Sequence, residues 1–368
     1  SVHIISAFYW TNATRFGTSG FCMVSRCKVL ANTVASMPQA PIIDIHAHFY
    51  PESFLKLLGE EGGSFGIRVR HDDPKGPVLE MKGGMLGPLQ QAFTDLDIRI
   101  KEMKRKRVDI HALSLTRPMI YWADGALGLK LAQTMNDAMA EAHQAFSHRF
   151  LGLAILPMQE PQLALEELER ASRLPGIQGV YMGTNINGRD LSDPEFLPLL
   201  QRIEEMGLPV FLHPIRPLGP ERLEPYNFYN LLGFPFETAV AAAHLIFSGV
   251  LDRFPRLSFC LPHAGGALPW LIGRMNRGYK IWEACRGTKH KPSAYLRRFF
   301  YDTISHDPGA LIYLIRLVGA QRVMLGSDYC FEIGYDRPVE VVTRLAALSR
   351  ADQARILGSN AARLLKLG

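Results

Sequence analysis

Four histidines and one aspartate in this sequence have the residue types of a metal-dependent active site, and each stands at or just after a short apolar run. His46 and His48 follow the first run, and His213 ends another. His263 and Asp328 lie just beyond two more. Imidazole nitrogens together with one carboxylate suit zinc, and they also suit iron or manganese. These five residues therefore predict a site for a divalent metal ion.

The His-x-His spacing of His46 and His48 suits a pair of ligands, because side chains alternate along an extended chain and both rings then lie on one side. Each residue also has a plainer interpretation. Such histidine pairs are common, His213 stands before a proline at what could be a simple strand end, and Asp328 could be a turn residue. Their shared position favours the metal site, because one active-site face accounts for all of them.

From residue 41 onward, short apolar runs alternate with longer amphipathic segments. The predicted strands cover residues 42–45, 110–115, 150–156, 177–181, 209–213, 257–261, 299–303 and 322–325. The predicted helices cover residues 96–107, 127–147, 164–172, 195–206, 237–252, 267–284, 308–318, 338–348 and 351–367. Eight buried strands, each followed by a helix, favour a closed α/β fold, the (β/α)8 TIM barrel, over an open sheet. The residues that follow the strands then meet at one face, where active sites of this fold lie.

Two connections are unusually long, namely residues 49–94 after the first strand and residues 214–236 after the fifth. Loops of this length usually act as lids or subunit contacts. Residues 41–368 are predicted to form a single barrel domain. Residues 1–40 are predicted to be an N-terminal extension that is disordered or not native to the protein, with Met37 as the alternative start of the natural chain.

The composition is that of a globular enzyme, with 47% hydrophobic and 21% charged residues. The net charge of +6 is not gathered into basic blocks with interleaved aromatic residues, so no nucleic-acid partner is expected. Five cysteines without a CxxC pair indicate a reducing compartment, and we expect a cytoplasmic protein. No apolar run in the sequence approaches the roughly 20 residues of a membrane span, so no membrane partner is expected.

Several short motifs occur in a fixed order along the chain. They are Asp44-Ile45-His46-Ala47-His48-Phe49, Val210-Phe211-Leu212-His213-Pro214, Pro235-Phe236-Glu237-Thr238, Pro262-His263-Ala264-Gly265-Gly266, Leu271-Ile272-Gly273-Arg274 and Arg322-Val323-Met324-Leu325-Gly326-Ser327-Asp328-Tyr329. From Ile42 to the C-terminus the chain resembles the amidohydrolase superfamily, and within it the branch of aminocarboxymuconate semialdehyde decarboxylase. The resemblance implies one divalent metal, usually zinc, held by His46, His48, His213 and Asp328. It also implies that His263 is the acid–base residue.

Two positions depart from the pattern of that branch. The arginine that binds the substrate carboxylate before the first long helix is matched by Gly87, and the aromatic residue after the fifth strand is replaced by Ile215. The branch's second carboxylate-binding arginine, which is contributed across a dimer interface, is matched by Arg274. We therefore expect a different carboxylic acid as substrate, bound by Arg274 and by Arg216, whose planar fork suits a carboxylate. Arg216 could equally be a surface loop residue.

Two further features concern the substrate and the oligomer. His306 follows the seventh predicted strand at the same rim as the five site residues, and it is predicted to face the substrate. Trp270, Met275, Tyr279 and Trp282 form an apolar stripe on the helix that carries Arg274. The stripe could pack on the barrel, but a homodimer interface is the preferred interpretation.

Together these features predict a metal-dependent, non-oxidative decarboxylase of an aromatic or unsaturated, muconate-like carboxylic acid, with His263 and Asp328 as catalytic residues. The alternative is a metal-dependent hydrolase that cleaves a carbon–carbon bond of a ring-cleavage product, or an ester, lactone or amide. One metal site serves both chemistries, so the residues leave the choice open. A barrel with a purely structural metal is disfavoured, because such sites have no acid–base residue beside them.

Overall fold

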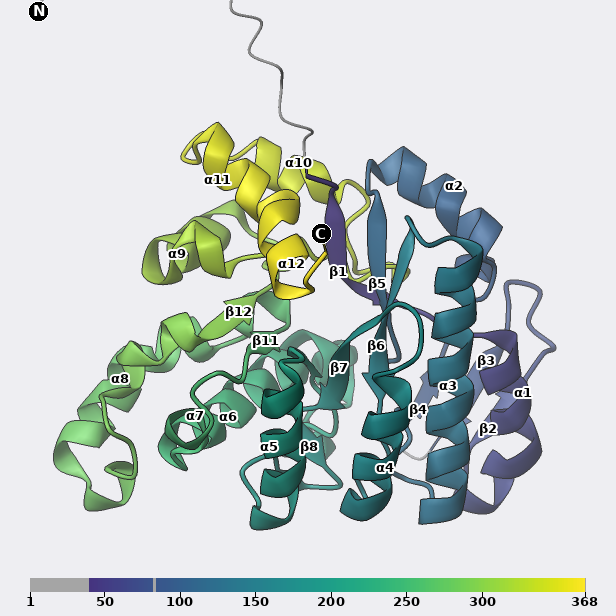
Figure 1. The fold of residues 1–368 in the computed structure, drawn as a ribbon, viewed down its shortest axis with the longest axis horizontal. Helices are drawn as coiled ribbons and strands as arrows, with labels where there is room; N and C mark the ends of the chain where they lie inside the picture. Colours follow the sequence, from purple (N-terminus) through teal and green to yellow (C-terminus); the bar gives the residue numbers. More distant parts are fainter. Residues whose placement is uncertain (1–39, 82–83, 368) are drawn as a thin grey trace, which may run out of the picture. The chain divides into compact units, whose positions relative to one another are not determined.

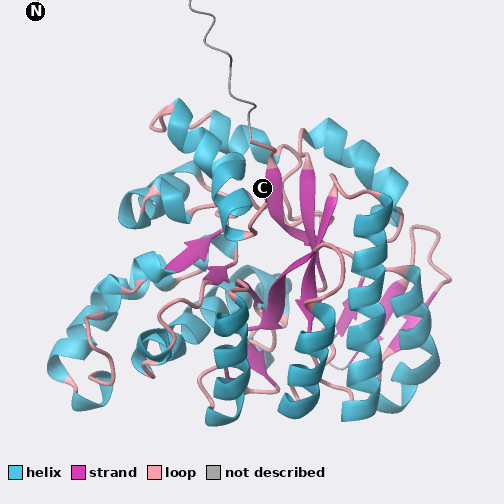
Figure 2. Cartoon of the chain, viewed as in Figure 1, coloured by secondary structure: helices cyan, strands magenta, loops and turns pink. Residues whose placement is uncertain are grey.

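The structure is a computed structural model, and it describes residues 40–81 and 84–367. Seven of the eight predicted strands form one parallel sheet in the order β1-β5-β6-β7-β10-β11-β12. Their bounds are β1 Ile43–His48, β5 Ile110–Ser114, β6 Phe150–Ile155, β7 Ile177–Gly183, β10 Val210–His213, β11 Phe259–Leu261 and β12 Phe299–Tyr301. The strands run through the middle of the fold with helices outside them (Figure 2).

The eighth predicted strand, residues 322–325, does not form a continuous ladder, but it occupies the expected place in the barrel. Tyr301 of β12 pairs in parallel with Val323, and Ala47 of β1 pairs in parallel with Tyr329. The segment thus joins the two edge strands of the seven-stranded sheet. The barrel is closed by isolated bridges in place of a full strand, and this brings the end of the segment next to the end of β1.

β1 shows how one strand serves both the core and the site. All six of its residues are buried, and apolar and polar residues alternate along it. Since successive side chains of a strand point to opposite sides, Ile43, Ile45 and Ala47 share one side and Asp44, His46 and His48 share the other. The apolar set belongs to the hydrophobic core. The predicted pair of rings on one side of the chain is therefore confirmed.

The predicted helices are present, and most have bounds within a few residues of the prediction. They are α2 Leu96–Lys106, α3 Gly125–Ala145, α4 Pro161–Ala171, α5 Leu197–Met206, α6 Phe234–Phe247, α7 Val250–Arg253, α8 Leu268–Ile281, α9 Pro308–Val318, α10 Pro338–Thr343, α11 Arg350–Ala354 and α12 Asn360–Leu364. α3 packs on β6 and β7, and α4 lies between α3 and α5 (Figure 1). Helix 237–252 is divided between α6 and α7 by Gly249, whose φ of 76° only glycine adopts readily. The last helix is interrupted by a π turn at Arg355–Ser359.

The two long connections have structure of their own. The first contains helix α1, Glu52–Glu61, followed by a three-stranded antiparallel sheet of β2 Arg68–Arg70, β3 Val78–Met81 and β4 Gly84–Leu86. The second consists mainly of short helical turns over Pro220–Arg222, Pro225–Asn227 and Tyr229–Gly233. A small hairpin of β8 Asn185–Ile186 and β9 Arg189–Asp190 follows β7. Both long connections are therefore structured segments that contain helices, helical turns or short strands.

Two expectations need comment. The N-terminal extension and the alternative start at Met37 fall on residues 1–39, which lie outside the described residues. Among the described residues, the helical stretch Pro225–Phe247 reaches the length and apolarity of a membrane span, with a mean hydropathy of 1.3, although no apolar run of that length was expected. Half of its most apolar window is buried within the chain, as is usual for a helix that packs on a core.

Candidate metal centre and active site

The predicted metal ligands converge at the C-terminal ends of β1 and β10 and just after the segment that closes the barrel. The Nε2 atoms of His46 and His48 are 3.1 Å apart, and Asp328 Oδ1 lies 3.1 Å from Nε2 of His48 and 3.6 Å from Nε2 of His46. The ring of His213 is centred 5.5 Å from that of His46 and 5.2 Å from that of His48. All four side chains are buried. They surround a single point at the predicted face of the barrel.

The Nδ1 atoms of His46 and His48 are held by partners outside this cluster. His46 Nδ1 lies 2.8 Å from Asp302 Oδ2, and a carboxylate only accepts, so Nδ1 carries the proton. His48 Nδ1 lies 3.2 Å from Ser114 Oγ, which itself donates to the carbonyl of Ala47 at 3.4 Å. The hydroxyl therefore accepts from Nδ1–H of His48. Nε2 of each ring therefore carries no proton, and the lone pairs of the two Nε2 atoms face each other.

His213 follows the same pattern, since its Nδ1 donates to the carbonyl of Pro214 at 3.1 Å. Burial lowers the pKa of His48 to about 4 and also lowers the pKa of His213, so both rings are neutral. Burial would raise the pKa of Asp328, but the close contacts with His48, His46 and His263 hold its pKa well below the usual range. Three converging lone pairs and one ionised carboxylate fit a divalent cation, and a fixed second ring nitrogen is typical of metal-binding histidines.

His46 gives independent support for a positive charge at this point. Burial would lower the pKa of His46, but hydrogen bonding to Asp302 and the charges of the surrounding carboxylates raise it above its ordinary value. The carboxylates near His46 therefore favour a positive charge beside this ring. A cation in contact with Nε2 of His46 would supply that charge without protonating the ring.

Asp302 is the most connected residue of the site, and the sequence analysis missed it. Its Oδ2 accepts from Nδ1 of His46 at 2.8 Å and from the backbone N–H of His263 at 2.9 Å. Its Oδ1 accepts from the N–H groups of Ala264 at 2.7 Å and Ile304 at 3.0 Å. Its position directly after β12, at the same rim as the other site residues, is the signal that could have revealed it.

His263 differs from the other three histidines of the site. It follows β11 in a tight turn where its own φ is 52° and that of Ala264 is 55°. Its Nδ1 is buried and has no hydrogen-bond partner among the described residues. The ring lies nearly parallel to Phe234, with the centroids 6.5 Å apart, and burial lowers its pKa. His263 is thus a neutral imidazole with a free nitrogen, which suits acid–base catalysis.

Two more buried residues, Asp44 and Arg99, hold the backbone of the site residues in place. Asp44 accepts from the N–H groups of His46 at 3.0 Å and Ser327 at 3.1 Å, so it ties β1 to the segment that carries Asp328; burial raises its pKa to about 6. The fully buried Arg99 donates to the carbonyl oxygen of His48. No role was predicted for Asp44, although it lies in one of the sequence motifs, or for Arg99, which is one of several basic residues on α2.

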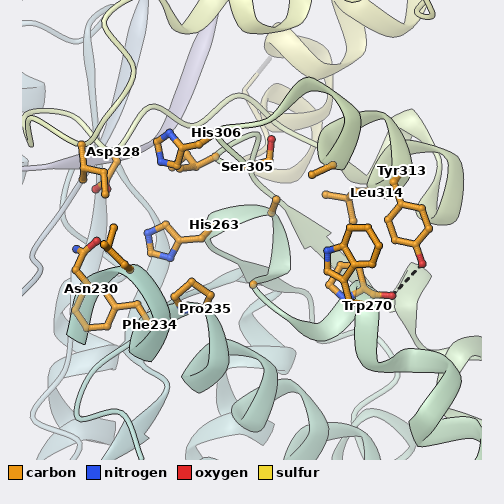
Figure 3. A pocket seen from close by; sticks show the side chains of 17 residues that line it. Asn230, Phe234, Pro235, His263, Trp270, Ser305, His306, Tyr313, Leu314 and Asp328 are labelled. Atoms are coloured by element: carbon orange, nitrogen blue, oxygen red, sulfur yellow. Dashed lines mark hydrogen bonds between the residues drawn. The ribbon is translucent and has the colours of Figure 1, made fainter. Parts of the chain in front are cut away.

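Two cavities meet at the site, and both are lined by Asn230, Phe234, His263, Asp328 and Ile333. The smaller, of about 260 Å³, is bounded by aromatic and apolar side chains that include Pro235, Trp270, Tyr313 and Leu314 (Figure 3). The larger, of about 510 Å³, is lined by residues of both long connections and of the β5 end, among them Lys75, Gln90, Phe93, Thr116 and Arg117. A small aromatic molecule fits such a space.

The three predicted substrate-binding residues differ in their position relative to the two cavities. His306 lines the smaller cavity on the side of His263 and Asp328 (Figure 3). Arg216 lines neither cavity: its backbone turns with a φ of 44°, and its Nη1 donates to Asn187 Oδ1 of the β8–β9 turn at 3.2 Å. Its placement gives no support to a role in binding the carboxylate. Arg274 is exposed on α8, where only a second subunit could bring it to a site.

A protein-family model described as amidohydrolase matches residues 43–367. The chain belongs to the amidohydrolase family. The match begins with β1 and runs to the last described residue, so it includes every residue of the site. The family membership expected from the sequence motifs is confirmed.

Several proteins similar to this amidohydrolase are decarboxylases. It is 34% identical over 328 residues to 2-amino-3-carboxymuconate-6-semialdehyde decarboxylase of Dictyostelium discoideum, covering 88% of this chain and 91% of that protein. The structure of 5-carboxyvanillate decarboxylase from Sphingomonas paucimobilis is 28% identical, with a TM-score of 0.77 and coverage of 89% and 100%. Dihydroxybenzoic acid decarboxylase from Polaromonas sp. JS666, solved with manganese and 2-nitroresorcinol, is 25% identical, with a TM-score of 0.74 and coverage of 89% and 97%. The barrel fold and the decarboxylase branch are thereby confirmed.

Proposed function

We propose that this amidohydrolase is a metal-dependent, non-oxidative decarboxylase of an aromatic or unsaturated carboxylic acid. The observation that carries the proposal is the contrast among the four histidines. The three predicted ligands have Nδ1 atoms held by protein partners, whereas Nδ1 of His263 has none among the described residues. His263 thus stands beside the ligand cluster as a free acid–base group and lines both cavities. The decarboxylase relatives support the same reaction.

The ligands in this proposal are His46, His48, His213 and Asp328, and they hold one divalent ion. When bound, the ion would supply Lewis-acid polarisation of substrate oxygens and electrostatic stabilisation of the charge that develops on carbon–carbon cleavage. Zinc is the preferred ion, with manganese or iron as alternatives. The manganese in the Polaromonas relative supports a divalent ion of this kind.

The chain's own residues then supply the proton. When carbon dioxide leaves, the electron pair of the broken bond stays on the substrate carbon, and a proton must take the vacated position. His263 takes up a proton from solvent at its free nitrogen, delivers a proton to the carbon from the side of the cavity that it lines, and returns to its neutral form. Asp302 keeps the turn of His263 in place through its backbone N–H. Phe93, Phe234 and Phe331 around the same cavity exclude water from the reacting carbon.

The test is to incubate the protein with a panel of hydroxylated benzoic acids, including 5-carboxyvanillate and dihydroxybenzoic acids, in water enriched in oxygen-18. We expect stoichiometric release of carbon dioxide and a product that has lost the carboxyl group. Incorporation of the heavy oxygen into the remaining organic product, without carbon dioxide release, would show hydrolysis and overturn the proposal.

We also propose a homodimer built on α8, with Arg274 contributed to the partner's site and His306 facing the substrate within each subunit. The apolar stripe divides into two parts. Met275 packs against the core, but Trp270 is 67% exposed and Trp282 is 57% exposed. Large exposed tryptophans are typical of subunit interfaces.

The remaining proposals concern the domain and the compartment. Residues 41–368 are proposed to act as one barrel domain with its lid formed by the two long connections. A cytoplasmic location is proposed because the cysteines within the described residues, Cys260, Cys285 and Cys330, are all free thiols.

A further inference from the structure

Arg117 is the half-buried cation of the larger cavity. It follows Thr116, whose Oγ1 lies 3.3 Å from Nε2 of His213, so it stands one residue from a contact of the ligand cluster. It lines the cavity together with His263 and Asp328. Its position just after β5 places it at the rim where the other functional side chains of the barrel lie.

The guanidinium of Arg117 has no anionic partner. Across residues 40–81 and 84–367, no carboxylate pairs with it and it donates no hydrogen bond. It lies over the ring of Tyr229, 5.0 Å from the ring centroid. Half-buried Arg170, by contrast, is paired with the acidic side chains of Asp137 and Glu167. A partly desolvated guanidinium without a partner is a ready receptor for an anionic ligand.

The backbone of Arg117 is anchored while its side chain is free. The hydroxyl of the fully buried Tyr50 donates to the carbonyl oxygen of Arg117. The other cation of the cavity, Lys75, is exposed on the first long connection, and the acid Glu332 is exposed as well. Arg117 is thus the cation best placed to meet a ligand that has entered the cavity.

The anionic group that suits Arg117 is not the carboxylate that leaves. A cation bound to the departing carboxylate would stabilise the substrate and lose its partner as carbon dioxide forms, which opposes the reaction. A group that stays on the molecule is held equally before and after bond cleavage and can orient it. We propose that Arg117 binds a second carboxylate, or an equivalent anionic group, that the substrate retains. This inference rests on the proposed function, and it makes Arg117 a determinant of specificity.

The experiment compares diacids with neutral analogues of the same shape. The probes are benzene-1,2-, 1,3- and 1,4-dicarboxylate, each matched with its monoamide, and binding to the protein with one equivalent of zinc is measured by calorimetry. For at least one geometry we expect the diacid to bind about tenfold to a hundredfold more tightly than the monoamide, the range for a charge-assisted pair. Arg117→Gln removes the preference, and Arg117→Lys keeps part of it because the charge remains without the fork. Arg222→Gln, on the exposed second connection, is the matched control and keeps it.

Two results would overturn the inference. One is equal binding of diacid and monoamide by the unaltered protein in every geometry, which needs no variant to fold. The other is a preference that survives Arg117→Gln, including one lost instead in Lys75→Gln or Arg216→Gln. The outcome is separable from that of the proposed function, because carbon dioxide release is measured independently. A diacid preference without any decarboxylation overturns only the proposed reaction, and decarboxylation without the preference overturns only the role of Arg117.

Discussion

The carboxylate of Asp302 joins His46 of β1 to His263, the proposed acid–base residue that follows β11. Its Oδ2 accepts from Nδ1 of His46 at 2.8 Å and from the backbone N–H of His263 at 2.9 Å. One buried oxygen therefore sets both the orientation of a proposed ligand and the turn that presents the proposed proton donor. Neither group can move without disturbing the other.

Asp302→Asn should weaken metal binding about tenfold to a hundredfold, the usual effect of losing the partner of a ligating histidine. Each carboxylate oxygen of Asp302 accepts hydrogen bonds from two donors. In asparagine an NH2 group replaces one of these oxygens and cannot accept from the two donors that the oxygen bound. Competition with a chelator measures the affinity. Asp307→Asn, which alters the N-cap of α9 next to the site, is the matched control and should leave the affinity unchanged. Equal affinities for the Asp302 variant and the unaltered protein would contradict the account.

His263→Gln should retain its metal but lose carbon dioxide release by about a hundredfold to ten-thousandfold, the range for a general acid or base. Glutamine keeps a polar side chain in the turn but cannot shuttle a proton at neutral pH. Steady-state kinetics and metal content are measured on the same preparation. A variant that has lost its metal would place His263 among the ligands, and one with full activity would remove it from the mechanism.

Arg99→Ala should lower the free energy of unfolding by about 3 kcal/mol, since it leaves the carbonyl of His48 unsatisfied and opens a void in the core. Because Arg99 is fully buried, solvent water does not take over the hydrogen bond that its side chain makes. Urea titration checks the value. Lys101→Ala, which is exposed on the same helix, should change the stability by less than about 0.5 kcal/mol. Similar values for the two variants would exclude the structural role of Arg99.

The double substitution Ile281→Ser with Trp282→Ser should convert the proposed dimer to a monomer at micromolar concentration. The two side chains are 44% and 57% exposed at the end of α8, and large apolar anchors dominate the energy of such interfaces. Sedimentation equilibrium measures the mass. Leu218→Ser, an exposed apolar residue on the second long connection, serves as the control. A monomer in the unaltered protein would overturn the proposed dimer outright.

The clustering of the five site residues could be predicted from their positions at strand ends, and the family resemblance divided them into four proposed ligands and His263. His46 and His48 alternate with core residues along β1, and Asp328 follows the segment that closes the barrel. The arginine that lines the larger cavity is Arg117, whereas Arg216, the predicted carboxylate-binding residue, lines neither cavity. Arg216 is close to His213 in sequence, but the chain turns at Arg216 and carries its side chain to Asn187.

Other contacts could not be predicted, because they join residues far apart in the chain. His46 and Asp302 are separated by 256 positions, and no local sequence pattern predicts their contact. Arg99 has the spacing of an ordinary basic residue on an amphipathic helix, and only the tertiary structure reveals that it is buried, in contact with His48, Phe49 and Tyr329. The rule that locates sites at strand ends would have indicated both Asp302 and Arg117, had it been applied to every strand.

The most direct test of the central claim is the metal content of protein purified without added metal. The account predicts about one equivalent of zinc, manganese or iron per chain, lost in both His48→Ala and Asp328→Ala because each removes one of four ligands. His244→Ala, on the exposed face of α6, should keep the metal. Metal that is absent from the unaltered protein, or that persists in both ligand variants, would contradict the account.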